Sequence, residues 1–131
     1  MQLPVTRTSV VVTDSDTGAL GHVSNSASVN FMQLGRNHFL EQVARQFAYV
    51  EPPLVVNVNL DIYQACYPGD DVEVVTWCGA IGKKSFKVCN EIYSNGKLAA
   101  KGSVTAVGYD SSLKQSKYLP SDWQISNYKE K

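Results

Sequence analysis

The alternation of apolar and polar residues divides the chain into one strand, one long helix and four further strands. Residues 5–13 are rich in β-branched side chains and predict the first strand. From residue 27 to about residue 47, apolar side chains recur at helical spacing: Val29, Met32, Phe39, Leu40, Val43 and Phe47. Strand-like runs follow at 54–63, 71–80, 85–93 and 98–109. The pattern therefore predicts one early helix and an antiparallel meander after it.

Turn-forming residues separate these elements. The segment 14–25, rich in Asp, Ser, Gly and Asn, predicts a loop between the first strand and the helix. At its end Ser24, Asn25 or Ser26 can cap the helix by accepting hydrogen bonds from first-turn amides. Two prolines at 52 and 53 prevent the helix from continuing into the next element. The Asn-Gly pair at 95–96 is the strongest hairpin signal in the chain.

An early helix and a later antiparallel sheet indicate an α+β fold in which the sheet wraps on the helix. One helix covers one face of such a sheet. The other face and the strand edges need covering too, so dimerisation is the simplest solution. The 131 residues predict a single domain, with a core over about 5–110 and a tail over 111–131. We expect the tail to run over the surface, with Trp123 as its anchor.

Composition and charge narrow the classes of function. Lys and Arg number 12, as do Asp and Glu, and no basic run is present, which argues against nucleic-acid binding. No stretch is apolar enough to span a bilayer, and the N-terminus lacks a signal-peptide pattern. The three cysteines, Cys66, Cys78 and Cys89, form no C-x-x-C pair and are expected to be small buried strand residues. We therefore expect a cytoplasmic protein without a metal site.

The segment 14–25 carries most of the chemistry. It places acids, glycines and His22 directly before a helix N-terminus. The N–H groups of a first helical turn lack partners within the helix, and the helix dipole concentrates positive charge there. These groups would stabilise the oxyanion that develops on a thioester carbonyl, and a nearby carboxylate could attack the carbonyl or activate water. From these residues alone, helix caps and turns are the more common explanation.

Four motifs follow one another along the chain. They are A-L-G-H-V-S-N at 19–25 with Phe31 and L-G-R at 34–36, Y-P-G-D-D-V at 67–72, I-G-K-K-S-F at 81–86, and A-A-K-G at 99–102. The first is similar to the D-x-D-x-x-G-H-V-N-N…A-R signature of hotdog-fold acyl-CoA thioesterases of the 4-hydroxybenzoyl-CoA thioesterase type. The others resemble that family's G-D-x-V turn, I-G-x-K-S-F hairpin and small-residue final strand. The ordered set covers most of residues 5–110.

This resemblance implies both a fold and an activity. The implied fold is a long central helix wrapped by a five-stranded antiparallel sheet, paired into a homodimer and often into a homotetramer. The implied activity is hydrolysis of an acyl-CoA without a metal or an organic cofactor. The active site would lie where the loop and helix start of one subunit face its neighbour.

The carboxylate of the signature is displaced in this chain. In the family the catalytic aspartate stands four residues before the histidine of G-H-V, and this chain has Gly18 at that position. The first acid of the D-x-D pair falls on Asp16, and Asp14 lies two residues earlier. Because glycine permits conformations that redirect its neighbours, we expect Asp16 to supply the carboxylate. A different mechanism and impaired catalysis are the alternatives.

The resemblance also implies roles for the residues after the acids. Asn25 matches the second Asn of the motif and is expected to cap the helix or to orient the catalytic loop. His22 and Val23, which follow Gly21 in the substrate-binding loop, are expected to bring backbone N–H groups to the thioester oxygen. A role of His22 as catalytic base is the alternative.

Two further sets of residues are candidates for substrate binding. Lys83, Lys84 and Ser85 could bind the phosphates of CoA, since ammonium groups on a hairpin suit a mobile anion; solvated surface lysines are the alternative. Asn57 and Asn59 lie on the strand that borders the acyl and pantetheine channel in hotdog enzymes. Ordinary strand alternation explains them equally well.

Two other functions compete with hydrolysis. A hotdog protein that binds the acyl thioester of CoA or of an acyl carrier protein, with weak or no turnover, is favoured by Gly18. Hotdog dehydratases pair a catalytic histidine with an acid on the helix. This helix offers His38 but has Gln33 where an acid would help, and the G-H-V element argues against that class.

Overall fold

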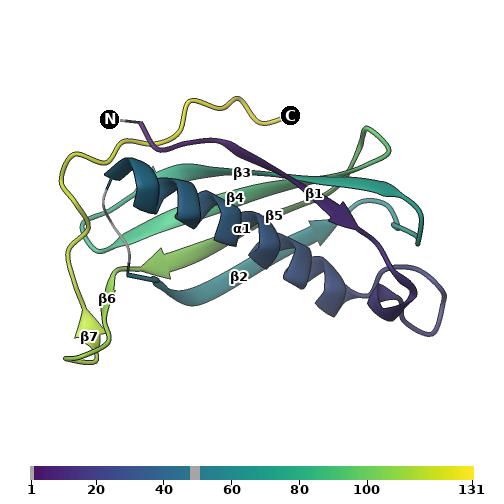
Figure 1. Ribbon diagram of the computed structural model, residues 1–131, viewed down its shortest axis with the longest axis horizontal. Coiled ribbons are helices and arrows are strands. Elements are labelled where there is room, and N and C mark those ends of the chain that lie inside the picture. Colours follow the sequence, from purple (N-terminus) through teal and green to yellow (C-terminus); the bar gives the residue numbers. More distant parts are fainter. Residues whose placement is uncertain (1, 48–50) are drawn as a thin grey trace.

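One long helix crosses a five-stranded antiparallel sheet in the computed structural model, which describes residues 2–47 and 51–131 (Figure 1). The helix, α1, spans Asn25–Phe47. The strands of the sheet are β1 (Thr6–Val11), β2 (Leu54–Ile62), β3 (Asp71–Ile81), β4 (Ser85–Ser94) and β5 (Lys97–Val107). A 3₁₀ turn covers Asp14–Asp16, and a small hairpin pairs β6 (Tyr109–Asp110) with β7 (Gln115–Ser116). The predicted α+β architecture is confirmed.

The helix begins two residues before the predicted start because Ser24 caps it. The Ser24 hydroxyl oxygen accepts a hydrogen bond from the Ala27 N–H (3.1 Å), and the Ser24 carbonyl accepts one from the Ser28 N–H (3.0 Å). Asn25, which was expected to cap the helix or to orient the loop, is therefore its first residue. The first strand is shorter than predicted, since the 3₁₀ turn follows it closely.

The order of the strands differs from a simple meander. β3, β4 and β5 are consecutive neighbours, but β2 pairs with β5, which gives the order β1-β3-β4-β5-β2. β2 pairs with β5 along its whole length, and the N–H groups of Tyr63 and Gln64 continue this contact by donating to the Ala99 carbonyl (2.8 and 3.2 Å). The sheet thus has two edges, β1 and β2.

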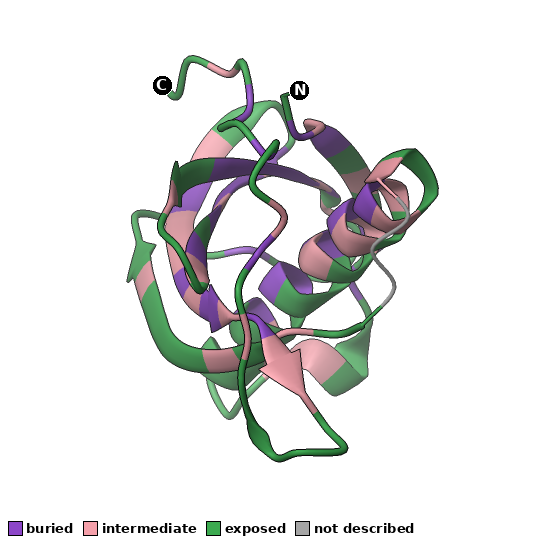
Figure 2. Ribbon diagram, turned by 90° about the vertical axis from the view of Figure 1, so that its left-hand side faces the viewer, coloured by how far each residue is buried: buried purple, intermediate pink, exposed green. Residues whose placement is uncertain are grey.

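The core lies between α1 and the inner face of β1, β3, β4 and β5 (Figure 2). Met32, Phe39 and Val43 are at most 1% exposed, as their spacing predicted. Val29 was expected on the same stripe but is exposed, and Phe31 is buried instead. Gly35 marks a close approach of α1 to β3, because a Cβ there would lie 2.6 Å from Thr76 Oγ1 and from Val74 Cγ1.

The helix leaves β2 largely uncovered. Four apolar side chains of this edge strand are 46–57% exposed: Leu54, Val56, Val58 and Ile62. Such a row beside unpaired backbone groups is a surface on which another strand can pair. None of the helices in the described part of the chain is long and apolar enough to cross a membrane.

The C-terminal tail returns along the sheet. Trp123, the predicted anchor, is buried and packs edge-on against Phe86 with ring centroids 5.4 Å apart. Further on, the Ser126 hydroxyl donates to the Pro4 carbonyl (2.9 Å) and accepts from the Cys78 N–H (2.8 Å). The tail therefore ties the start of the chain to β3.

The three cysteines are free thiols. Cys78 and Cys89 lie on β3 and β4, as expected, but only Cys78 is buried and Cys89 is partly exposed. The prediction of a strand position was wrong for Cys66, which is buried in the connection between β2 and β3. That connection passes the start of α1, where Cys66 meets the loop before the helix.

Candidate functional site

A cavity of about 270 Å³ opens beside the N-terminus of α1. Its mouth lies between the start of the helix and the segment 62–66 that follows β2. His22 and Asn25 are at this mouth. The floor consists of buried apolar side chains from α1, β4 and β5, namely Phe31, Ile92, Ala99 and Ala100. The cavity therefore has a polar entrance and an apolar interior, the usual build of a ligand site.

A loop closed on itself presents His22. The Gly18 N–H donates to the His22 carbonyl (3.0 Å), and the Gly21 N–H donates to the Gly18 carbonyl (3.1 Å). Gly21 has φ +79°, a conformation that favours glycine, whereas Gly18 does not adopt a positive φ. Gly18 was expected to redirect the loop, but the glycine whose conformation shapes it is Gly21.

The ring of His22 has one nitrogen occupied. Its Nδ1 lies 3.1 Å from the Val23 carbonyl oxygen. Since a carbonyl only accepts, a neutral His22 carries its proton on Nδ1, and its Nε2 has an open lone pair. The ring also meets Tyr67 edge-on, with centroids 6.4 Å apart. His22 is thus positioned at the mouth with one basic nitrogen available.

The amides at the helix start differ in their availability. The Val23 N–H, expected to reach a thioester oxygen, donates instead to the Cys66 carbonyl (2.8 Å). The Ala27 N–H is taken by the cap. Within the described residues, the N–H groups of Asn25 and Ser26 have no hydrogen-bond acceptor. The first turn of α1 itself contains no acid.

The acids of the loop lie outside this cavity. Asp16 Oδ2 accepts hydrogen bonds from the Thr13 N–H (2.9 Å) and from the Thr13 hydroxyl (3.3 Å), which closes the 3₁₀ turn. The Asp14 carbonyl accepts from Thr17. Neither carboxylate is among the residues that line the cavity. The structure therefore brings together His22 and Asn25. The Asp16 carbonyl accepts a hydrogen bond from the Ser24 N–H (2.9 Å) beside them, but the Asp16 carboxylate is turned to Thr13 and does not line the cavity.

The other predicted binding residues are also separate from the cavity. Asn57 and Asn59 hydrogen-bond to each other (2.6 Å) on β2 and pair with Thr105 and Ser103, on the face of the sheet turned away from the helix. Lys83, Lys84 and Ser85 are at the far end of β4 from Ile92, roughly 23 Å away at the rise of a strand. Lys84 Nζ lies 4.9 Å above the Tyr118 ring.

Cys66 lines the cavity, although the sequence contains no signal for it. Burial raises the pKa of its thiol, with a smaller opposing effect from a hydrogen bond with Ser94. A thiol kept neutral is a weak nucleophile, so Cys66 serves as part of the wall. Its carbonyl, which accepts from Val23, joins the β2–β3 connection to the loop before the helix.

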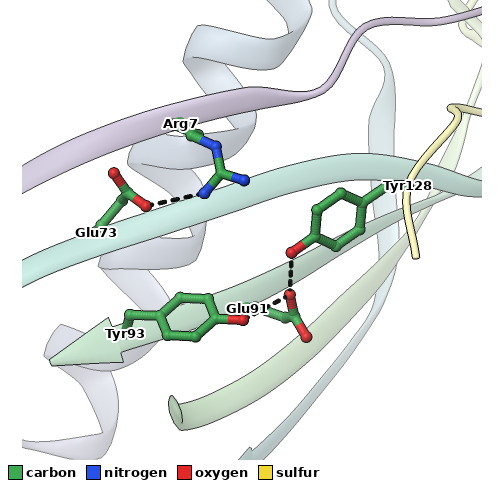
Figure 3. A network of polar contacts seen from close by, with 5 residues as sticks. All are labelled: Arg7, Glu73, Glu91, Tyr93 and Tyr128. Atoms are coloured by element: carbon green, nitrogen blue, oxygen red, sulfur yellow. Dashed lines mark hydrogen bonds and ion pairs between the residues drawn. The ribbon is translucent and has the colours of Figure 1, made fainter. Parts of the chain in front are cut away.

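A second hollow, of about 390 Å³, lies on the outer face beside β1, β3 and the tail. Beneath it the fully buried Glu91 accepts hydrogen bonds from the hydroxyls of Tyr93 (3.1 Å) and Tyr128 and from the Lys131 N–H (2.8 Å) (Figure 3). Arg7 and Glu73 form an ion pair beside it (3.1 Å). These polar groups are engaged with one another, so the network holds the tail.

His38 takes no part in either hollow, since its Nδ1 lies 2.9 Å from the Thr8 hydroxyl on β1. In the described part of the chain, no cluster of His, Cys, Asp or Glu could hold a metal ion. The chemistry available at the cavity is therefore the imidazole of His22, the open N–H group of Asn25 with that of Ser26 next to it in the helix, and an apolar floor.

Comparisons with known proteins show the family and the fold of this chain. The sequence model of the Thioesterase-like superfamily matches residues 10–125. A predicted thioesterase from Bacillus stearothermophilus shares 23% identity with a TM-score of 0.82, covering 91% of this chain and 90% of that one. A thioesterase from Thermus thermophilus, complexed with coenzyme A and Zn, shares 25% identity with a TM-score of 0.79 and coverage of 88% and 85%.

The DHNA-CoA thioesterase of Staphylococcus aureus is also similar, with 18% identity, a TM-score of 0.72 and coverage of 82% and 74%. A search among curated proteins finds no significant match. These structural matches confirm the predicted fold and the resemblance to hotdog thioesterases.

Proposed function

We propose that this chain, which belongs to the Thioesterase-like superfamily, hydrolyses the thioester of an acyl-CoA. The observation that carries the proposal is the cavity at the start of α1. It brings together Asn25, whose N–H group is open and is followed in the helix by that of Ser26, and the imidazole of His22 above an apolar floor. A thioester needs these three elements: an oxyanion site, a base for water and room for the acyl group.

The proposed reaction follows from these positions. The thioester oxygen docks against the amides of Asn25 and Ser26, at the positive end of the helix dipole. His22 Nε2 accepts a proton from a water molecule as its oxygen attacks the carbonyl carbon. The tetrahedral intermediate then expels the CoA sulfur, which takes up the proton from the imidazolium, and the free acid leaves. Asp16 remains a candidate for the base only if the loop rearranges, because its carboxylate is engaged with Thr13.

We further propose a homodimer formed through β2. The support is the unpaired edge and its exposed apolar residues, which end at Ile62 on the mouth of the cavity. Light scattering of Val58→Lys should show a monomer, while Val11→Lys on the opposite edge should remain dimeric. A monomeric parent protein would refute this assembly.

An antiparallel β2–β2 pair would also give a role to the β3–β4 hairpin. The twofold axis would bring the hairpin end of one subunit to the cavity end of its partner. We propose that Lys83, Lys84 and Ser85 contact the CoA phosphates bound to the neighbouring subunit. Lys83→Ala and Lys84→Ala should bind CoA more weakly than the parent protein. Binding of CoA by the parent should also depend more strongly on salt concentration.

The test of hydrolysis is thiol release from a panel of acyl-CoAs. The parent protein should release CoA, and His22→Gln should lower kcat by about 10²–10⁴-fold, the usual contribution of a positioned base. His38→Gln is the matched control, because His38 contacts Thr8 and lies outside the cavity. Asp16→Asn separates the two candidate bases. Release that is lost in Asp16→Asn and retained in His22→Gln would overturn the assignment of His22.

A second function is favoured by one observation. Neither Asp14 nor Asp16 lines the cavity, so the site lacks the carboxylate that the signature places there. A protein that binds an acyl thioester of CoA or of an acyl carrier protein, without efficient turnover, would have this arrangement. Tight binding of acyl-CoA in calorimetry, with no thiol release, would establish this second function and end the first.

We also propose that the protein works in the cytoplasm. The support is that its three thiols are free, as is usual in a reducing compartment. Titration of three thiols per chain in protein isolated under non-reducing conditions would agree with this location.

A further inference from the structure

The floor of the cavity contains an irregularity in β5. Ile92 of β4 pairs with Ala100, and the next residue, Tyr93, pairs with Leu98, so Ala99 has no partner on β4. This is a β-bulge, a feature that re-aims side chains and is frequent beside active sites. Ala99 and Ala100 are 1% and 4% exposed, and both line the cavity. The bulge therefore turns two consecutive small residues to the same hollow.

The bulge also holds the opposite wall. The Ala99 carbonyl accepts hydrogen bonds from the N–H groups of Tyr63 (2.8 Å) and Gln64 (3.2 Å), which belong to the segment that forms the mouth. Ala99 thus contributes its side chain to the floor of the cavity and its carbonyl to the hydrogen bonds that hold the rim. With side chains no larger than a methyl group at 99 and 100, the space between Phe31 and Ile92 stays open.

The size and chemistry of this floor limit what it can hold. A volume of about 270 Å³ lies just below the lower end of pockets that enclose drug-sized ligands, which is about 300 Å³. No Lys, Arg, Asp or Glu is among the lining residues. A charged group at the end of the acyl chain would therefore lose its hydration without gaining a partner.

We propose that the Ala99–Ala100 bulge forms the acyl end of the site and restricts its substrates to acyl-CoAs with a short, uncharged acyl group. This inference rests on the proposed thioesterase activity. Ala100 is the position that sets the accepted length, because it forms the floor between its two strand-pairing neighbours, Ile92 of β4 and Ile62 of β2, which also line the cavity. Long-chain and dicarboxylic acyl-CoAs are excluded by size and by charge respectively.

The experiment compares kcat/KM for acetyl-, butanoyl-, hexanoyl-, palmitoyl- and succinyl-CoA. The parent protein should favour the short uncharged substrates over palmitoyl-CoA and succinyl-CoA. Ala100→Val should lower the hexanoyl-to-acetyl ratio of kcat/KM by about 10-fold or more, the effect of one misfitting methylene in a hydrophobic pocket. Ala100→Gly, which only removes atoms, should raise the same ratio.

Ala106→Val is the matched control. Ala106 is fully buried on the same strand and the same face but does not line the cavity. Its variant should lose stability by packing strain and keep the parent chain-length profile. Because ratios are compared within one variant, a general loss of activity does not imitate the expected result.

The outcomes separate the inference from the activity on which it rests. Absence of thiol release from every substrate in the parent protein would remove the proposed function and the inference together. Preference for palmitoyl-CoA or succinyl-CoA would overturn the inference and leave the thioesterase activity standing. An unchanged hexanoyl-to-acetyl ratio in Ala100→Gly would do the same, even if Ala100→Val failed to fold.

Discussion

The hydroxyl of Tyr128 offers a sharp test of how the C-terminal tail is held. It donates a hydrogen bond to the Glu91 carboxylate, which is fully buried under the tail (Figure 3). The Tyr128 ring packs on Trp77 with centroids 4.5 Å apart. The substitution Tyr128→Phe keeps this ring contact and removes the hydroxyl alone. Any loss of stability then measures the hydrogen bond and the carboxylate left without it.

The expected loss is about 1.5–3 kcal/mol in the free energy of unfolding, the usual value for a hydrogen bond to a charged group. Glu91 keeps two other donors, the Tyr93 hydroxyl at 3.1 Å and the Lys131 N–H at 2.8 Å. The substitution therefore removes one of the three hydrogen-bond donors of the carboxylate and leaves the other two in place. For a domain of this size, roughly 3–4 °C of melting temperature corresponds to 1 kcal/mol.

Urea unfolding followed by tryptophan fluorescence is a suitable assay, because Trp77 contacts the substituted ring. Tyr118→Phe is the control. Tyr118 is 69% exposed, so its hydroxyl should contribute less than about 0.5 kcal/mol. Tyr93→Phe should give an intermediate loss, since its hydroxyl reaches the same carboxylate oxygen in a part-buried position.

A Tyr128→Phe protein as stable as its parent would show that this hydrogen bond does not stabilise the fold. It would mean that the buried carboxylate does not depend on this donor for its solvation. Tyr128→Phe could also keep its global stability while residues 124–131 become rapidly cleaved by a protease, and this result would have another meaning. The tail would then open separately from the sheet, and Glu91 would hold it without supporting the core.

Three other predictions concern the pH dependence, the helix start and the helix–sheet contact. Burial, followed by the interaction with Glu91, raises the pKa of Tyr128 above its ordinary value near 10. The unfolded chain therefore loses this proton first, and stability falls as pH rises past about 10. The difference in unfolding free energy between the parent protein and Tyr128→Phe should narrow from about pH 9 to pH 11. Ser24→Ala removes the cap of α1 and should reduce stability by about 0.5–2 kcal/mol, measured by urea unfolding, while Ser24→Asn should retain most of it. Gly35→Ala places a Cβ 2.6 Å from the stiff side chains of Thr76 and Val74 and should cost about 1–3 kcal/mol, and a melting temperature equal to that of the parent would contradict this close contact.

Local features could be predicted from the order of the residues. The helical spacing of Met32, Phe39 and Val43 identified three of the most buried side chains of α1, because a helix turns its periodic residues to one side whatever it packs on. Asn95 and Gly96 adopt φ values of +52° and +81°, which such a pair accepts more readily than other residues. The resemblance to thioesterases extended the prediction from these local features to the whole fold, because the shared motifs lie at the boundaries of helices and strands.

The pairing of strands and the composition of the cavity required the folded chain. β2 could have joined β3, its neighbour in sequence, but it pairs along its length with β5. Cys66 meets Val23 through a contact between segments far apart in the sequence, and Ala99 faces the cavity because a bulge interrupts its pairing. Asp16 had the right residue type but turns to Thr13. Such contacts depend on packing between distant segments, and the periodicity of a single segment carries no information about them.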